Sequence, residues 1–124
     1  MKATILLIED NEQNRYLTTF LLEQAGHTVV SATTGPQGIL MAARTVPDLI
    51  LLDIQLPGMD GYAVADALKN DEALRSIPIV VVTSYAMVGD REKIEAAGAQ
   101  GYIEKPINPE TFVREVEQYF GVSK

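Results

Sequence analysis

Residues 48–53 read Asp-Leu-Ile-Leu-Leu-Asp, with four apolar residues in a row between two acids. A strand that is buried on both faces shows such a continuous apolar run, so this stretch predicts a central strand of a parallel sheet. Similar runs occur at residues 5–8 and at 77–83, where β-branched residues dominate. The sequence therefore predicts three strands at the centre of one sheet.

The stretches between these runs carry apolar residues at helical spacing. We expect further strands at 28–32 and 100–103, and helices at 14–25, 36–44, 61–69, 90–97 and from 108 to about 120. Gly26 and Gly98 stand where the first and fourth helices end, in a position that favours positive φ. Asp60 is expected to cap the third helix.

Strands and helices thus alternate through five βα units, a pattern typical of a parallel sheet with helices on both faces. The chain of 124 residues is too short for an eight-stranded barrel. We expect an α/β fold with a doubly wound five-stranded sheet of order 2-1-3-4-5, forming one domain over residues 1–124.

Composition excludes several classes of function. Cysteine is absent and there is one histidine, so disulfides, zinc–sulfur sites and iron–sulfur clusters are excluded. The net charge of −7 opposes direct binding to nucleic acid. No apolar run reaches the roughly 20 residues of a membrane span, and no secretory signal is evident. We expect a cytoplasmic protein.

In a doubly wound sheet, ligands bind beyond the carboxyl ends of the strands. Polar residues follow these ends, in chain order Glu9 and Asp10, Asp53, Thr83 and Ser84, and Lys105. Three carboxylates at one edge repel one another by a few kcal/mol per pair at an effective dielectric near 20. A divalent cation and the lysine would compensate this repulsion, and oxygen ligands favour Mg²⁺ before Mn²⁺ or Ca²⁺. A carboxylate nucleophile, a metal, a hydroxyl and a lysine are the parts needed to form an aspartyl phosphate.

Four motifs together resemble the receiver domains of two-component response regulators. They are ILLIEDN at 5–11, PDLILLDIQLPGMDG at 47–61, IPIVVVTSYAM at 77–87 and AQGYIEKPIN at 99–108. The resemblance covers essentially the whole chain. Within the family, the sequence is similar in character to free-standing receivers of the DivK type or to receivers attached to hybrid kinases. The resemblance implies the CheY-like fold.

The resemblance implies that Asp53 accepts a phosphoryl group from the phosphohistidine of a histidine kinase or a histidine phosphotransfer protein. It implies that Asp10 and Asp53 hold Mg²⁺ together with the backbone carbonyl of Gln55, with Glu9 acting through water. It further implies that the chain is a signalling phosphoacceptor and not an enzyme, with at most weak self-phosphorylation from small donors and self-dephosphorylation.

By the same resemblance, Thr83 and Tyr102 are the switch hydroxyl and the switch aromatic, and Lys105 pairs with the phosphoryl group. The peptide bond between Lys105 and Pro106 is expected to be cis. Phosphorylation is then expected to reshape the face of the fourth helix, fifth strand and fifth helix, which signals to a downstream protein as a monomer or weak dimer.

Departures from the family pattern are mild. Glu9 stands where many members have aspartate, and Ser84 stands where alanine is frequent. Gln55 and Tyr85 occupy positions that tune the phosphoryl lifetime in this family.

Other functions remain as alternatives. The chain is expected to be complete and free-standing because it begins at Met1, but it could be a receiver cut from a hybrid kinase or a receiver that binds proteins without phosphorylation. An aspartyl-phosphate phosphatase would carry an acid where Gln55 stands. A flavodoxin-like cofactor site would be repelled by Glu9 and Asp10.

Some residues carry a structural expectation only. We expect His27 to be exposed, because it follows a glycine that ends a helix. Val113, Val116 and Phe120 are expected to form the buried stripe of the last helix. Glu117 is expected to lie on the solvated face of that helix.

Overall fold

A computed structural model describes residues 2–84 and 88–120. Five parallel strands form one sheet of order β2-β1-β3-β4-β5, which confirms the predicted doubly wound α/β fold. The strands are β1 (Thr4–Ile8), β2 (Thr28–Ala32), β3 (Leu49–Asp53), β4 (Ile79–Thr83) and β5 (Gly101–Glu104).

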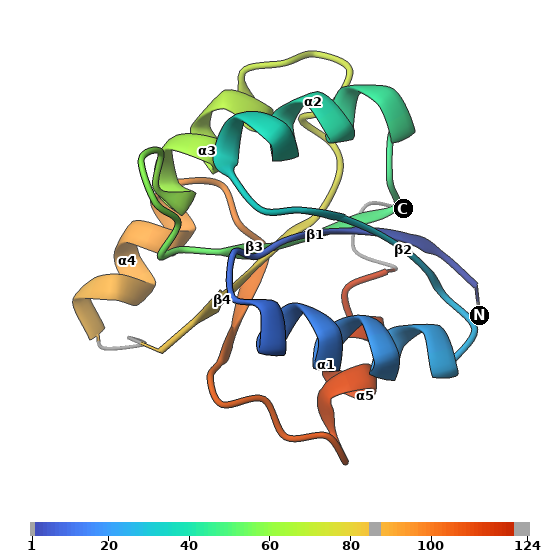
Figure 1. The fold of residues 1–124 in the computed structure, drawn as a ribbon. Helices are drawn as coiled ribbons and strands as arrows, with labels where there is room; N and C mark the ends of the chain where they lie inside the picture. Colours follow the sequence, from blue (N-terminus) through green and yellow to red (C-terminus); the bar gives the residue numbers. More distant parts are fainter. Residues whose placement is uncertain (1, 85–87, 121–124) are drawn as a thin grey trace.

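The helices are α1 (Glu12–Gln24), α2 (Gly35–Thr45), α3 (Gly61–Lys69), α4 (Val88–Ala96) and α5 (Phe112–Glu117). Helices α2 and α3 cover one face of the sheet, and α1 and α5 cover the other (Figure 1). Among the described residues, no helix combines the length and the apolar character that crossing a membrane requires.

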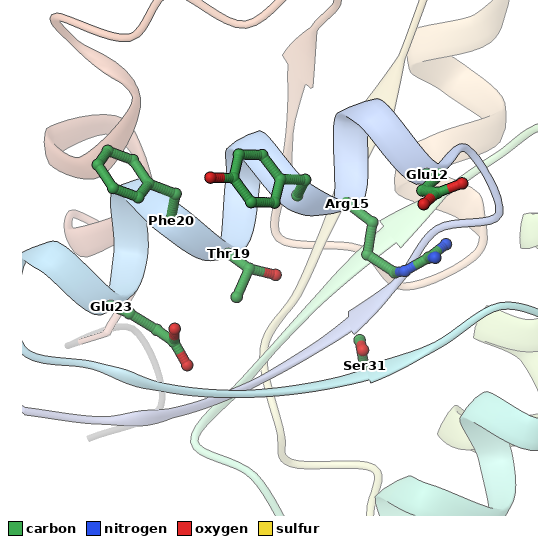
Figure 2. Close-up of a pocket in the computed structure, with 7 residues that line it drawn as sticks. Glu12, Arg15, Thr19, Phe20, Glu23 and Ser31 are labelled. Atoms are coloured by element: carbon green, nitrogen blue, oxygen red, sulfur yellow. The ribbon is translucent and has the colours of Figure 1, made fainter.

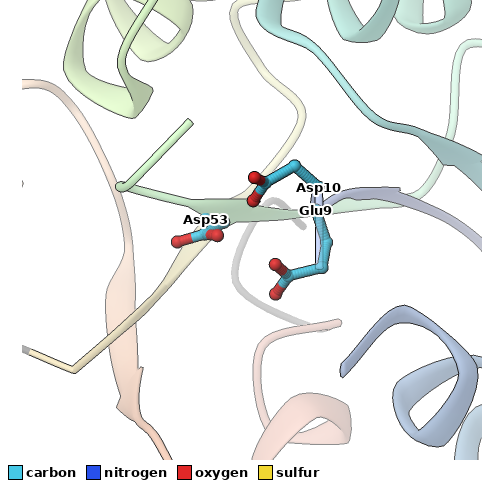
Figure 3. A group of neighbouring side chains, drawn as sticks. All are labelled: Glu9, Asp10 and Asp53. Atoms are coloured by element: carbon cyan, nitrogen blue, oxygen red, sulfur yellow. The ribbon is translucent and has the colours of Figure 1, made fainter. Parts of the chain in front are cut away.

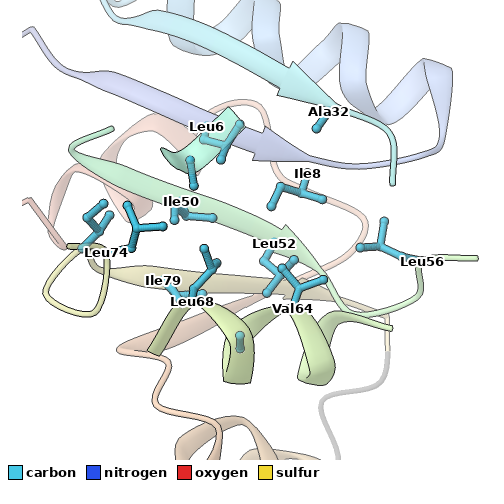
Figure 4. Packing of buried hydrophobic residues seen from close by; sticks show 13 residues of the cluster. Leu6, Ile8, Ala32, Ile50, Leu52, Leu56, Val64, Leu68, Leu74 and Ile79 are labelled. Atoms are coloured by element: carbon cyan, nitrogen blue, oxygen red, sulfur yellow. The ribbon is translucent and has the colours of Figure 1, made fainter. Parts of the chain in front are cut away.

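Both faces of the central strands are buried in apolar clusters. Successive side chains of a strand point to opposite faces of the sheet. Leu6, Ile50 and Leu52 therefore pack in the cluster under α2 and α3, and Figure 4 shows Ile50 and Leu52 beside Leu68 and Val64 of α3. Leu7 and Leu51 pack under α1 and α5. The continuous apolar run at 49–52 follows from this double burial.

The C-terminal helix is shorter than predicted. It begins at Phe112, not at residue 108, because Asn108 caps a turn: its side chain accepts from the amide of Glu110, 3.0 Å away. Val116 is buried, and Val113 and Phe120 pack partly buried against the same cluster, as expected. The remaining predicted elements differ from the observed ones by two residues or fewer at either end.

The expectation that His27 is exposed is wrong. Its side chain is fully buried, and both of its ring nitrogens have hydrogen-bond partners. The amide of Ala3 donates to Nδ1 over 3.1 Å, and Nε2 lies 2.8 Å from Glu117 Oε2. Glu117 is therefore half-buried beside His27 and not on a solvated face, and His27 links the residue just before β2 to α5.

The turn between β3 and α3 folds tightly back on the end of the strand. Asp60 caps α3 as predicted, accepting from the amide of Ala63 over 2.9 Å. The amide of Gly61 donates to the carbonyl of Ile54 over 3.0 Å. A Cβ at Gly61 would lie 2.6 Å from Ile54 Cα and 2.7 Å from the carbonyl oxygen of Asp53. Only glycine allows this close approach between two stretches of backbone.

The substitution Gly61→Ala is expected to lower the free energy of unfolding by about 1–3 kcal/mol, because backbone atoms must shift. This is the net loss, after the roughly 1 kcal/mol by which alanine favours a helix over glycine. Urea denaturation measures it. Asp66→Ala on the exposed side of α3 is the control and should change stability by no more than about 0.5 kcal/mol. Equal stability of Gly61→Ala and the wild type would contradict the packing described.

Candidate functional site

The carboxyl ends of the strands bring the predicted acids together at one edge of the sheet. Glu9 and Asp10 follow β1, and Asp53 is the last residue of β3. The register pairs Ile8 with Leu52, so the two strands end side by side. Each of the three acids offers a carboxylate oxygen within 4.8 Å of the others, as Figure 3 shows. Glu9 and Asp53 are buried, whereas Asp10 is exposed.

Lys105 bridges the two buried acids. Its Nζ lies 3.1 Å from Glu9 Oε1 and 3.2 Å from Asp53 Oδ2. All three side chains are largely removed from solvent, with 14% of the lysine exposed. Burial alone would lower the pKa of Lys105, but the charges of Glu9 and Asp53 outweigh it and raise that pKa above its ordinary value. The ammonium group is therefore a fixed positive charge between the two acids.

The environment of the buried Glu9 side chain changes its pKa. Burial, followed by the adjacent carboxyl of Asp53, raises its pKa from 4.5 to about 7. The amide of Asn11 and the ammonium of Lys105 lower this pKa and offset part of the increase. Near neutral pH, Glu9 therefore exchanges its proton readily, and a cation in the cluster would favour its ionised form.

Backbone amides hold the buried acids in place. The amide of Gln55 donates to Asp53 Oδ1 over 2.9 Å, and the amide of Asn11 donates to Glu9 Oε2 over 3.1 Å. The carbonyl of Gln55 is the predicted metal ligand, and the amide of the same residue orients Asp53. The orientation of both carboxylates thus comes from the loops that follow β1 and β3.

Arg15, which sequence reasoning alone does not identify as part of the site, supports the loop after β1. Its Nη1 donates to the carbonyl oxygen of Glu9 over 3.2 Å and to that of Asp10 over 3.4 Å. The available signal was its place in the first turns of α1, facing back toward the two acids. Arg15 thereby fixes the backbone that carries Glu9 and Asp10.

The residue that carries the predicted switch hydroxyl is the last of β4, one position beyond Val82, which the register pairs with Asp53. Thr83 is buried, and its carbonyl accepts from the amide of Lys105 over 2.8 Å. This bond ties the strand end that carries the hydroxyl to the segment that carries the ammonium group. Ser84 is exposed, and Tyr85 lies outside the described residues.

The aromatic residue of β5 contacts a basic residue of α4. Tyr102 is half-buried, and the guanidinium carbon of Arg91 lies 5.3 Å from the centre of its ring. A cation over an aromatic face is attracted by the ring. The contact joins β5 to α4. The peptide bond between Lys105 and Pro106 is cis, as predicted.

Comparison with known proteins decides the family. The model of the response regulator receiver domain family matches residues 5–117. The chain belongs to this receiver family. It is 40% identical over 121 residues to the polar-differentiation response regulator DivK of Brucella ovis, covering 98% of each chain.

Solved receivers share the fold as well. The receiver domain of the sensor histidine kinase PA1611 from Pseudomonas aeruginosa is 33% identical with a TM-score of 0.88, and the match covers 98% of this chain and 99% of that one. That structure has a magnesium ion coordinated in its active site cleft. The chemotaxis protein CheY4 of Vibrio cholerae is 26% identical with a TM-score of 0.90, covering 95% and 98%. The predicted two-component receiver with a CheY-like fold is confirmed.

The raised pKa of Glu9 predicts how stability depends on pH in the absence of metal. Between pH of about 4.5 and 7, the folded protein keeps a proton on Glu9 that the unfolded chain has released. The free energy of unfolding therefore receives a contribution from Glu9 that is full below this window and is lost as the pH rises through it. Glu9→Gln should show a shallower fall in stability across the window.

Urea denaturation in EDTA at several pH values between 4.5 and 8 measures this difference. Glu23→Gln, which alters an exposed acid of α1, is the matched control and should keep the slope of the wild type. Identical slopes in Glu9→Gln and the wild type would show that Glu9 titrates as an ordinary exposed acid.

Proposed function

We propose that this receiver is a phosphoacceptor of a two-component phosphorelay, and that Asp53 accepts the phosphoryl group. A carboxylate oxygen of Asp53 attacks phosphorus of a phosphohistidine on a histidine kinase or histidine phosphotransfer protein. The new P–O bond forms as the P–N bond breaks, and the imidazole leaves with the electron pair. The observation that carries this proposal is the position of Asp53, at a strand end with an ammonium group 3.2 Å from its Oδ2.

The cluster also fits a divalent cation. Three carboxylates face one ammonium group, so the site has an excess of negative charge and only oxygen ligands. Such a set suits Mg²⁺, and also Mn²⁺. Asp10, Asp53 and the carbonyl of Gln55 would hold the ion, with Glu9 acting through water. The ion would supply charge neutralisation for the incoming phosphoryl group.

The remaining residues of the site carry the response. Lys105 and the hydroxyl of Thr83 pair with the new dianion, which draws Thr83 toward Asp53. Tyr102 then moves inward, and the face of α4, β5 and α5 changes its surface for a downstream protein target. The existing bond between the backbones of Thr83 and Lys105 supports such coupling. Gln55 and Tyr85 remain predicted to adjust the phosphoryl lifetime, and Ser84 remains predicted to add a hydrogen bond to the phosphoryl group.

The comparisons support two kinds of protein in which this receiver could function. The likeness to DivK along 98% of both chains favours a free-standing regulator. The likeness to the receiver of a sensor histidine kinase favours a hybrid kinase. We propose one receiver domain over residues 1–124 that signals through protein contacts and is not a metabolic enzyme. A cytoplasmic location and a monomer or weak dimer remain predictions.

Incubation with acetyl phosphate and Mg²⁺ is expected to add one phosphoryl group to the wild-type chain, which intact mass spectrometry detects. EDTA and the substitution Asp53→Asn should each abolish the adduct, because the first removes the cation and the second removes the nucleophile. Asp66→Asn on α3 is the matched control and should be labelled like the wild type.

Labelling of Asp53→Asn to the level of the wild type would place the acceptor elsewhere. Failure of the wild type to form any adduct, with this donor and with a phosphorylated histidine kinase, would favour a receiver that binds proteins without phosphorylation.

A further inference from the structure

Helix α1 presents an exposed stripe that the proposed phosphorylation does not use. Glu12, Tyr16, Phe20 and Glu23 follow one another at spacings of four, four and three residues, which places them on one face of the helix. Tyr16 is 73% exposed and Phe20 is 51% exposed. Their rings stack at 16° with centres 6.4 Å apart. The stripe therefore has a preformed aromatic centre and an acid at each end.

This stripe forms one wall of a hollow of about 350 Å³. The other wall is β2, which contributes Ser31, and Arg15 and Thr19 complete the lining. Figure 2 shows Glu12 and Glu23 at opposite ends of the row of side chains, with Ser31 on the strand across from it. The hollow therefore lies between α1 and an edge of the sheet.

Strand β2 has one neighbour among the described strands and so leaves an edge open. The amide of Thr28 donates to Ala3, and the carbonyl of Ala32 accepts from Glu9, so these groups point toward β1. Because backbone groups of successive strand residues point in alternate directions, the N–H and C=O groups of Val29 and Ser31 point away from β1. An open edge of this kind accepts a further strand.

We propose that an extended segment of a partner protein adds to β2 as a sixth strand and inserts an apolar side chain beside Tyr16 and Phe20. In this partner segment, one basic residue lies two positions before the apolar residue and another lies two positions after it. Successive side chains on one face of a strand are about 7 Å apart, so the two basic residues span about 14 Å. Glu12 and Glu23 are separated by about 16 Å along the helix axis, a distance that long basic side chains bridge.

Charge selects this occupant over others. The guanidinium of Arg15 is bound to the carbonyls of Glu9 and Asp10, and the two acids of the stripe outnumber it. A second copy of this chain carries a net charge of −7 and would bring acids against acids. A basic and apolar strand instead pairs with the acids, the aromatic rings and the free backbone groups of the edge at once.

The probe is a synthetic peptide of sequence Ser-Arg-Thr-Leu-Thr-Arg-Ser, blocked at both ends and titrated into the full ¹⁵N-labelled chain. We expect saturable amide shifts at Ser31 and along the exposed face of α1. Phe20→Ala should weaken binding about tenfold, as for a central aromatic contact. Glu12→Gln and Glu23→Gln should each weaken it about two- to fivefold and reduce its dependence on salt.

Ser31→Pro tests the strand itself, because proline removes the outward N–H and is tolerated on an edge strand. It should abolish binding, whereas Ser31→Ala should bind like the wild type. An amide spectrum of each variant checks that the fold is kept.

Four outcomes would overturn the proposal. They are the absence of saturable shifts, equal binding of the same peptide with glutamate in place of arginine, and full binding by Ser31→Pro, which would indicate a docked helix. The fourth is a set of shifts on β2 that depend on protein concentration without peptide, which would indicate a second copy of the chain.

Discussion

The ammonium group of Lys105 lies between two buried carboxylates, 3.1 Å from Glu9 Oε1 and 3.2 Å from Asp53 Oδ2. Removing like charges from water is costly unless an opposite charge and hydrogen bonds accompany them. The parallel sheet meets this requirement because β1, β3 and β5 all end at the same edge. The amides of Asn11 and Gln55 and the backbone bond from Lys105 to Thr83 then fix the three charged groups relative to one another.

This arrangement leaves the cluster short of positive charge. One lysine faces three acids. Because the pKa of Glu9 is about 7, this residue keeps its proton below neutral pH, which reduces the repulsion among the acids. A divalent cation would resolve it differently, by favouring the ionised form of every acid. The proposed phosphorylation adds a further negative charge at Asp53, and Lys105 and Thr83 are the groups that we propose pair with it. Burial and the excess of negative charge in the cluster therefore account for the raised pKa of Glu9, and the same excess of charge accounts for the proposed need for a cation.

Much of this was predictable from the sequence. The run at 49–52 identified a doubly buried strand, and the residues that follow each strand identified the cluster, because parallel strands share one carboxyl edge. The start of α5 was misplaced because Asn108 caps a turn as readily as a helix. The burial of His27 depends on Glu117, ninety residues away, and the role of Arg15 depends on the path of the loop after β1. Contacts of this kind arise from tertiary packing and leave no local pattern.

The exchange of a proton on Glu9 for a cation is the central claim and can be measured directly. Calorimetric titration with Mg²⁺ at pH 7, in two buffers with different ionisation enthalpies, gives the number of protons released per ion bound. With a pKa of about 7 for Glu9, the wild type should release about half a proton, and Glu9→Gln should bind the ion without this release. Equal proton release by both proteins, or no binding of Mg²⁺ by the wild type, would contradict the claim.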